Sequence, residues 1–182
     1  MFIQTESTPN PASLKFLPDA VVLENGTADY PNADAASASP MAQRLFQING
    51  VKGVFLGHDF ITVTKDASYE WQTLKPQVLA AIMEHLSSNQ PIVNAGAAPQ
   101  LNADQVDEIS AQIIELLETR VRPAVAMDGG DIAFDRFEDG IVFLHLRGSC
   151  AGCPSSTATL KMGIENMLKH YVPEVIEVRA TN

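Results

Sequence analysis

Apolar residues recur along this chain at two spacings, one typical of helices and the other of strands. Intervals of three or four residues predict amphipathic helices. They occur in three stretches: Leu74, Val78, Ile82 and Leu86; Val106, Ile109, Ile113 and Leu116; Leu160, Ile164, Met167, Leu168 and Tyr171. Ser39-Pro40 predicts a further helix start, because a capping hydroxyl precedes a proline at the first helical position. Pro76 is expected in the first turn of its helix, where proline is tolerated.

Short apolar runs between turn residues predict the strands. Runs at 54–56 and 60–64 flank Gly57-His58-Asp59, and runs at 132–137 and 141–146 flank Asp139-Gly140, so each pair predicts a hairpin. Further strands are predicted at 2–5, 14–17, 21–23 and 174–179. The second half of the chain therefore has the element order α-β-β-α-β.

An uncharged stretch separates two halves of similar length. Residues 87–102 carry no charged side chain and consist mainly of small residues, amides and proline, a composition typical of a linker. We therefore predict two small α+β domains, residues 1–88 and 102–182, joined by a flexible linker at 89–101. Each domain must bury its own core, and at this size each would be only marginally stable.

Charge and composition argue against several classes of partner. The 182 residues are 46% hydrophobic and carry a formal net charge of -10 at pH 7. Nucleic acids and anionic membranes favour Lys and Arg, so we expect neither as a partner. No apolar run approaches the roughly 20 residues of a membrane helix. The first six residues have neither a signal-peptide nor a transit-peptide composition, so we expect a cytoplasmic protein.

Cys150 and Cys153 are the only cysteines and the clearest candidates for chemistry. They lie between a predicted strand end and a predicted helix start. Pro154 suits the first helical position, so helix N–H groups and the positive end of the helix dipole would face the sulfurs and favour thiolate. Most thiolate metal sites need four ligands, and this pair supplies two.

Several uses of the pair stay open on these residues alone. A buried structural role is disfavoured, because the pair lies in a polar Gly/Ser loop. A dithiol/disulfide oxidoreductase is possible, although a tight hairpin rather than a βαβ unit precedes the pair. A zinc site within one chain would need histidines, and none has paired spacing: His58, His85, His145 and His170. Two chains together supply four thiolates, which suits either a [4Fe-4S] cluster or a zinc-bridged dimer.

The surroundings of the cysteines resemble a known family. Residues 122–132, with Met127-Asp128-Gly129-Gly130-Asp131, and residues 148–165 closely resemble the NifU C-terminal domain of Nfu-type iron–sulfur cluster carriers. Thr8-Pro9-Asn10-Pro11 and residues 59–65 resemble the N-terminal domain of bacterial and mitochondrial Nfu proteins. These matches span nearly all of the chain apart from the linker.

The resemblance implies a function, a cofactor and partners. Nfu proteins receive or assemble a [4Fe-4S] cluster, hold it between subunits through the CxxC thiolates, and pass it to apo-proteins. It implies that Cys150 and Cys153 are the cluster ligands and that the protein is a carrier, not an enzyme. The implied partners are apo iron–sulfur clients, a cluster donor scaffold, and further copies of the chain in a homodimer or higher oligomer.

The same resemblance bears on the N-terminal half and on location. The N-terminal domain has no cysteine, so we expect it to recognise clients or partners. Mitochondrial members of the family begin with a targeting presequence. Here the family domain starts at Met1, so we expect a bacterial cytoplasmic protein.

Overall fold

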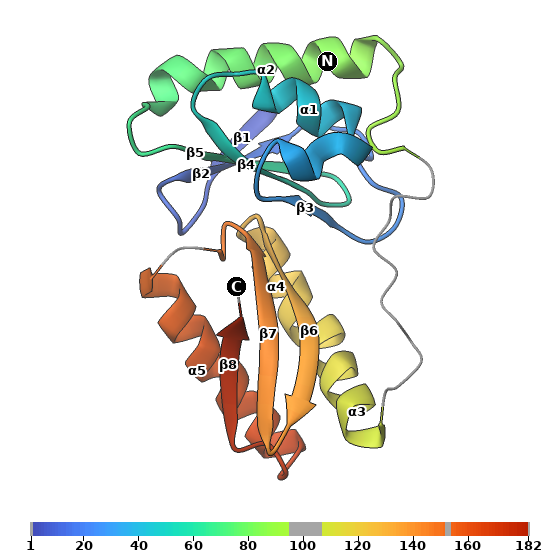
Figure 1. Ribbon diagram of the computed structural model, residues 1–182, viewed down its shortest axis with the longest axis vertical. Coiled ribbons are helices and arrows are strands. Elements are labelled where there is room, and N and C mark those ends of the chain that lie inside the picture. The colour runs from blue at the N-terminus through green and yellow to red at the C-terminus, as the bar shows by residue number, and fades with distance from the viewer. Residues whose placement is uncertain (1, 95–106, 152–153, 182) are drawn as a thin grey trace. The chain divides into compact units, whose positions relative to one another are not determined.

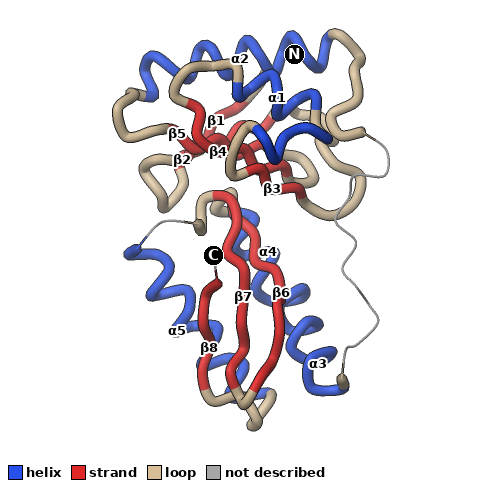
Figure 2. Tube along the Cα trace, in the orientation of Figure 1, coloured by secondary structure: helices blue, strands red, loops and turns tan. Residues whose placement is uncertain are grey.

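A computed structural model describes residues 2–94, 107–151 and 154–181, and the chain divides into two compact units, residues 1–99 and 100–182. The predicted α+β class is confirmed, since each unit combines helices with a sheet (Figures 1 and 2). The predicted linker at 89–101 lies outside the described residues from residue 95 onward. Within the described ranges, no helix has both the length and the apolar character needed to cross a membrane.

The first unit is built on a five-stranded antiparallel sheet in the order β1-β2-β5-β4-β3. Its elements are β1 (Gln4–Ser7), β2 (Ser13–Leu17), β3 (Ala28–Tyr30), the 3-10 helix η1 (Asp34–Ala38), α1 (Pro40–Phe46), β4 (Val51–Leu56), β5 (Ile61–Lys65) and α2 (Trp71–Ser87). Helices α1 and α2 lie on the same face of the sheet (Figure 1). The core between these layers includes Phe16, Leu45, Ile61, Val78 and Ile82, all fully buried.

Helix α1 begins where the sequence predicts. Ser39 Oγ accepts the N–H of Ala42 at 3.1 Å, and Pro40 follows as the first helical residue. The hydroxyl therefore satisfies one of the N–H groups that every helix start leaves unpaired.

Helix α2 begins earlier than expected. It starts at Trp71, so Pro76 lies inside the helix and the prediction of a first-turn proline is wrong. The proline has no N–H to donate to the carbonyl of Gln72, but the burial of three predicted apolar positions maintains the helix: Leu74, Val78 and Ile82. His85 is buried beside them, a position that the apolar pattern did not identify.

The hairpin predicted around residues 57–59 is confirmed, whereas the strand at 21–23 is not. Leu56 of β4 faces Ile61 of β5 across the turn. The backbone N–H groups of Val22 and Leu23 instead donate to the carbonyl of His58, at 2.7 and 3.2 Å. Tertiary contacts with that turn therefore take the place of a strand ladder, and the short β3 forms the edge of the sheet.

The second unit follows the predicted order α-β-β-α-β, except that two further helical elements follow the first helix. Its elements are α3 (Glu108–Leu116), the π-helix η3 (Leu117–Val121), α4 (Arg122–Met127), β6 (Gly130–Glu138), β7 (Ile141–Gly148), α5 (Pro154–Tyr171) and β8 (Glu177–Thr181). In the sheet, β7 pairs antiparallel with β6 and parallel with β8. The core joins one sheet face to the helices through Ile113, Ile132, Leu144, Leu168 and Val178.

The helical segment at the start of this unit is longer than the apolar stripe predicts. After α3 it continues through η3 into α4, which ends at Met127. The π turn precedes Pro123, whose missing N–H leaves the carbonyl of Thr119 without its usual helical donor. Proline and the Gly129-Gly130 pair are typical of helix ends and turns, so the sequence pattern does not predict this second helix.

The Asp139-Gly140 hairpin is confirmed in detail. Glu138 faces Ile141 across the turn, and Asp139 and Gly140 have φ angles of 52° and 79°. Both central residues are therefore left-handed, as a two-residue type I′ turn requires. The turn fixes the pairing near the hairpin, and a register shift between Phe134 and Arg136 then changes it by one residue, so the two together decide which residues meet at the other end of the strand pair.

Candidate functional site

Cys150 lies at the end of the β6–β7 pair that is distant from the hairpin. β7 ends at Gly148, which pairs with Gly130 at the start of β6. The Cys150 residue is 8% exposed and belongs to the apolar core of the second unit. Cys153 lies outside the described residues.

The turn that precedes β6 supports the Cys150 loop. The backbone N–H of Ser149 donates to the carbonyl of Gly129 at 3.3 Å, and its hydroxyl donates to the carbonyl of Asp128 at 2.5 Å. Ser149 is 2% exposed, so both bonds are shielded from water. The Asp128-Gly129-Gly130 segment is therefore the platform on which the cysteine loop rests.

Gly130 leaves the space in which the Cys150 sulfur lies. A Cβ atom built on Gly130 would overlap Cys150 Sγ and would lie 3.1 Å from the carbonyl oxygen of Arg147 and from the backbone nitrogen of Cys150. The sulfur thus occupies the space that the side chain of any other residue would need. We call this space the Gly130 niche.

A buried ion pair stabilises the start of β6, one residue beyond the niche. Arg122 Nε lies 2.9 Å from Asp131 Oδ1 and Nη2 lies 3.1 Å from Oδ2, a two-bond geometry, while Asp131 is only 4% exposed. The hydrogen bond to Asp131 is the main reason that the pKa of Arg122 is raised. Glu118 adds a longer contact of 3.3 Å to the same guanidinium. The pair joins the start of α4 to the strand that forms the niche.

The donor chemistry of the described residues is that of a soft sulfur ligand. Nowhere in residues 2–94, 107–151 and 154–181 do three His, Cys, Asp or Glu side chains gather in a way that could hold a metal ion. The histidines are engaged elsewhere: His58 with the carbonyl of Leu23, His85 with that of Pro91, His145 with Thr181, and His170 with the ring of Tyr171. A cysteine thiolate suits either an iron–sulfur group or a zinc site built from cysteines.

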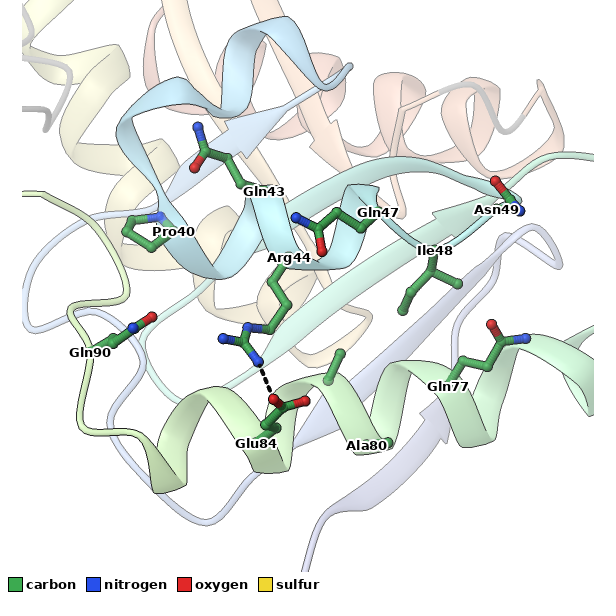
Figure 3. A pocket seen from close by; sticks show the side chains of 11 residues that line it. Pro40, Gln43, Arg44, Gln47, Ile48, Asn49, Gln77, Ala80, Glu84 and Gln90 are labelled. Carbon is green, nitrogen blue, oxygen red and sulfur yellow. Dashed lines mark ion pairs between the residues drawn. The ribbon is translucent and has the colours of Figure 1, made fainter.

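A second concave feature lies in the first unit between α1 and α2 (Figure 3). Its volume is about 700 Å³. Five of its eleven lining residues carry carboxamide side chains: Gln43, Gln47, Asn49, Gln77 and Gln90. Arg44 Nη1 pairs with Glu84 Oε1 across it at 3.0 Å, so its two charges compensate each other. We call this feature the amide groove. Sequence reasoning missed it, because the packing of two helices brings its residues together.

Comparison with known proteins covers both units. Residues 3–89 match the family model for the scaffold protein Nfu/NifU N terminal, and residues 113–179 match that for the NifU-like domain. The human protein named NFU1 iron-sulfur cluster scaffold homolog, mitochondrial, is 53% identical over 177 residues, which is 96% of this chain and 70% of the relative. The Arabidopsis thaliana NifU-like protein 4, mitochondrial, is 54% identical over 181 residues, which is 96% of this chain and 64% of the relative. A solution structure of a NifU-like protein from Saccharomyces cerevisiae is 28% identical with a TM-score of 0.47, over 52% of this chain and 86% of that one.

The names of these relatives correct the prediction of a bacterial cytoplasmic protein, which is wrong. The human, Arabidopsis and Drosophila relatives are all named mitochondrial. The prediction depended on the first residues of the chain and on where the family domain begins. Targeting segments are removed from the mature protein and contribute nothing to its fold, so those residues carry no information on location.

Proposed function

The chain belongs to the Nfu/NifU scaffold family, and we propose on this basis that it binds an iron–sulfur cluster through Cys150 and Cys153 and passes it to apo-proteins. The observation that carries the proposal is the match of residues 113–179 to the NifU-like domain, because this range contains both cysteines of the chain. The human relative named iron-sulfur cluster scaffold supports it over 96% of the chain.

The cargo we propose is a [4Fe-4S] cluster shared between two chains. Such a cluster takes four thiolates, and each chain has two cysteines. A homodimer, or a higher oligomer built from such pairs, is then the loaded form. A cluster held by two thiolates from each of two chains is also easier to release to an acceptor than one enclosed by four ligands of a single fold. The protein is in this view a carrier between a donor scaffold and apo iron–sulfur clients, and not an enzyme.

Anaerobic reconstitution with iron and sulfide tests the ligands and the sharing. We expect about four irons and four sulfides per two chains, with a dimeric or larger mass. Cys150→Ser and Cys153→Ser should each abolish cluster binding, and Ser68→Ala, an exposed position in the first unit, should not. A full cluster on a monomer, or one retained by either cysteine variant, would contradict the proposed site.

Transfer needs its own measurement. The loaded protein is mixed with an apo-enzyme that requires a [4Fe-4S] cluster, and the return of that enzyme's activity is compared with activation by free iron and sulfide. Faster activation by the loaded chain supports the carrier. A cluster that never leaves would show storage only. Colourless monomer with turnover in a disulfide-reduction assay would favour the oxidoreductase, and stoichiometric zinc would favour the zinc-bridged dimer.

For the first unit we propose recognition of clients or partners. The unit contains no cysteine, and its amide groove offers paired donors and acceptors without net charge. Gln43→Ala with Gln47→Ala should slow transfer to a client and leave reconstitution unchanged. Gln72→Ala is the matched control, because this glutamine is exposed on α2 but lies outside the groove. Equal transfer rates for all three proteins would remove the groove from the proposal.

A further inference from the structure

We infer that Gly130 is a positioning residue for Cys150. In the cluster-free chain the Cys150 thiol is buried in the Gly130 niche, and it must move out of the niche when a cluster binds. The inference depends on the proposed function only for its second half. The burial of the thiol in the niche is a property of the cluster-free chain and can be measured without any metal.

The packing around the sulfur supports the first part of the inference, that the thiol is buried in the niche. Cys150 is 8% exposed and lies in the same apolar core as Ile132 and Leu144. The niche has walls of backbone, formed by Arg147 and by Cys150 itself, so the walls cannot give way as a flexible side chain would. Gly130 has no positive φ, which means that its backbone does not require glycine. The absence of a side chain at this position therefore leaves room for the sulfur.

The loop that carries the thiol is anchored on the same platform. Ser149 is bonded twice to the preceding turn, through the carbonyls of Asp128 and Gly129. Gly148 turns the chain with a φ of 63°, a left-handed conformation that favours glycine. These contacts fix the backbone of the residues immediately before Cys150, so the thiol can leave the niche by rotation of its own side chain.

The proposed ligand role supports the second part of the inference, that the thiol moves out of the niche when a cluster binds. A cluster shared with another chain must contact the sulfur directly, and a residue that is only 8% exposed does not offer that contact. Loading therefore includes an outward movement of the thiol. Before loading, the same burial shields the sulfur from reagents that attack cysteine, because access is one of the factors that set thiol reactivity.

Alkylation of the cluster-free protein tests whether the Cys150 thiol is buried in the niche. All variants carry Cys153→Ser, so that Cys150 is the only thiol, and iodoacetamide modification is followed by mass spectrometry at fixed pH. Cys150 should react at least about tenfold more slowly in the native protein than in urea. Gly130→Ala should raise the native rate about tenfold, because the added methyl overpacks the niche and displaces the sulfur. Gly163→Ala, whose Cβ would meet nothing within 4 Å, should leave the rate unchanged.

A double-substitution cycle covers the case in which Gly130→Ala weakens folding. The unfolding equilibrium constant is measured for Gly130→Ala with cysteine and with alanine at position 150. If the sulfur fills the niche, the alanine at 150 should relieve the effect of Gly130→Ala by about tenfold. Native alkylation as fast as in urea, or additive effects in the cycle, would overturn the inference. Neither outcome would affect the proposed function, whose test is cluster content after reconstitution.

Discussion

The two units use the same helix-on-sheet packing but place their buried polar bonds differently. In the second unit these bonds converge on the end of the β6–β7 pair, where Ser149 and Asp131 hold the cysteine loop and the strand beneath it. In the first unit they lie in two places: Ser13 Oγ bonds Thr64 Oγ1 at 2.9 Å between β2 and β5, and Ser39 and His85 hold the segment that follows α2. Apolar packing thus determines where the layers lie, and a few polar bonds at the ends of elements determine which loop is held in place.

The segment held in the first unit is residues 88–94. Ser39 donates its hydroxyl to the carbonyl of Ile92 at 2.6 Å, and the N–H of Asn94 donates to the carbonyl of Ala38 at 2.8 Å. His85 Nε2 contacts the carbonyl of Pro91 at 3.2 Å. The first residues of the predicted linker are therefore packed against the first unit, although their composition resembles that of a free tether.

The largest expected difference between the units comes from the buried ion pair. Arg122→Leu removes both guanidinium hydrogen bonds to the buried Asp131 carboxylate and should destabilise the second unit by about 3 kcal/mol, somewhat less than for a fully buried pair because Arg122 is partly exposed. Far-UV circular dichroism should show the loss. Fluorescence of Trp71, the only tryptophan, should report an unchanged first unit.

Arg136→Leu is the control for that substitution. Arg136 also pairs with a carboxylate, that of Asp135 at 2.9 Å, but its side chain is 52% exposed. Solvent screening should keep its effect below about 1 kcal/mol. Equal effects of the two substitutions would show that burial does not distinguish these pairs. A parallel shift in Trp71 fluorescence would show that the units do not unfold independently.

Ser39→Ala is the corresponding test in the first unit. The substitution removes the cap of α1 and the bond to Ile92, and should destabilise this unit by about 1–2 kcal/mol. The Trp71 transition should shift to lower denaturant concentration, whereas Ser37→Ala, at an exposed position, should leave it in place. A shift confined to the second unit would contradict the assignment of these bonds.

His85 should make the first unit sensitive to acid. Burial lowers its pKa below the usual 6.5, and its Nδ1 is buried without a hydrogen-bond partner among the described residues. The neutral imidazole therefore stabilises the fold above pH 6.5, and this contribution is lost as the pH falls below 6.5 toward the folded pKa. The loss cannot exceed about 1.4 kcal/mol per pH unit. His85→Gln should flatten this pH dependence of the Trp71 transition, and His58→Gln, at an exposed histidine, should not.

The smallest expected effect is a stabilisation. Gly163 lies inside α5, and a Cβ there would meet nothing within 4 Å. Gly163→Ala should therefore stabilise the second unit by about 0.5–1 kcal/mol through helix propensity alone. Thermal unfolding followed by circular dichroism measures it. Destabilisation would mean that this face of α5 is covered in the folded protein.

The parts of the fold that the sequence predicted depend on local signals. The Ser39 cap and the Asp139-Gly140 turn act over a few neighbouring residues, and the structure confirms both. The predicted strand at 21–23 failed because the backbone there bonds to His58, a residue distant in sequence. Helix α4 was missed because the predicted apolar stripe ends at Leu116, whereas the helical segment continues through the π turn into α4.

For the site, the sequence by itself determined which candidate ligands are available: two thiols, in a glycine-rich loop between a strand and a helix. Only the tertiary structure decided that the Cys150 sulfur lies on Gly130 and that Ser149 is bonded to the turn at Asp128. The reason is that local patterns record a residue's neighbours along the chain. The niche depends instead on the register of β6 against β7 and on the ion pair from α4, which exist only once distant segments have packed together.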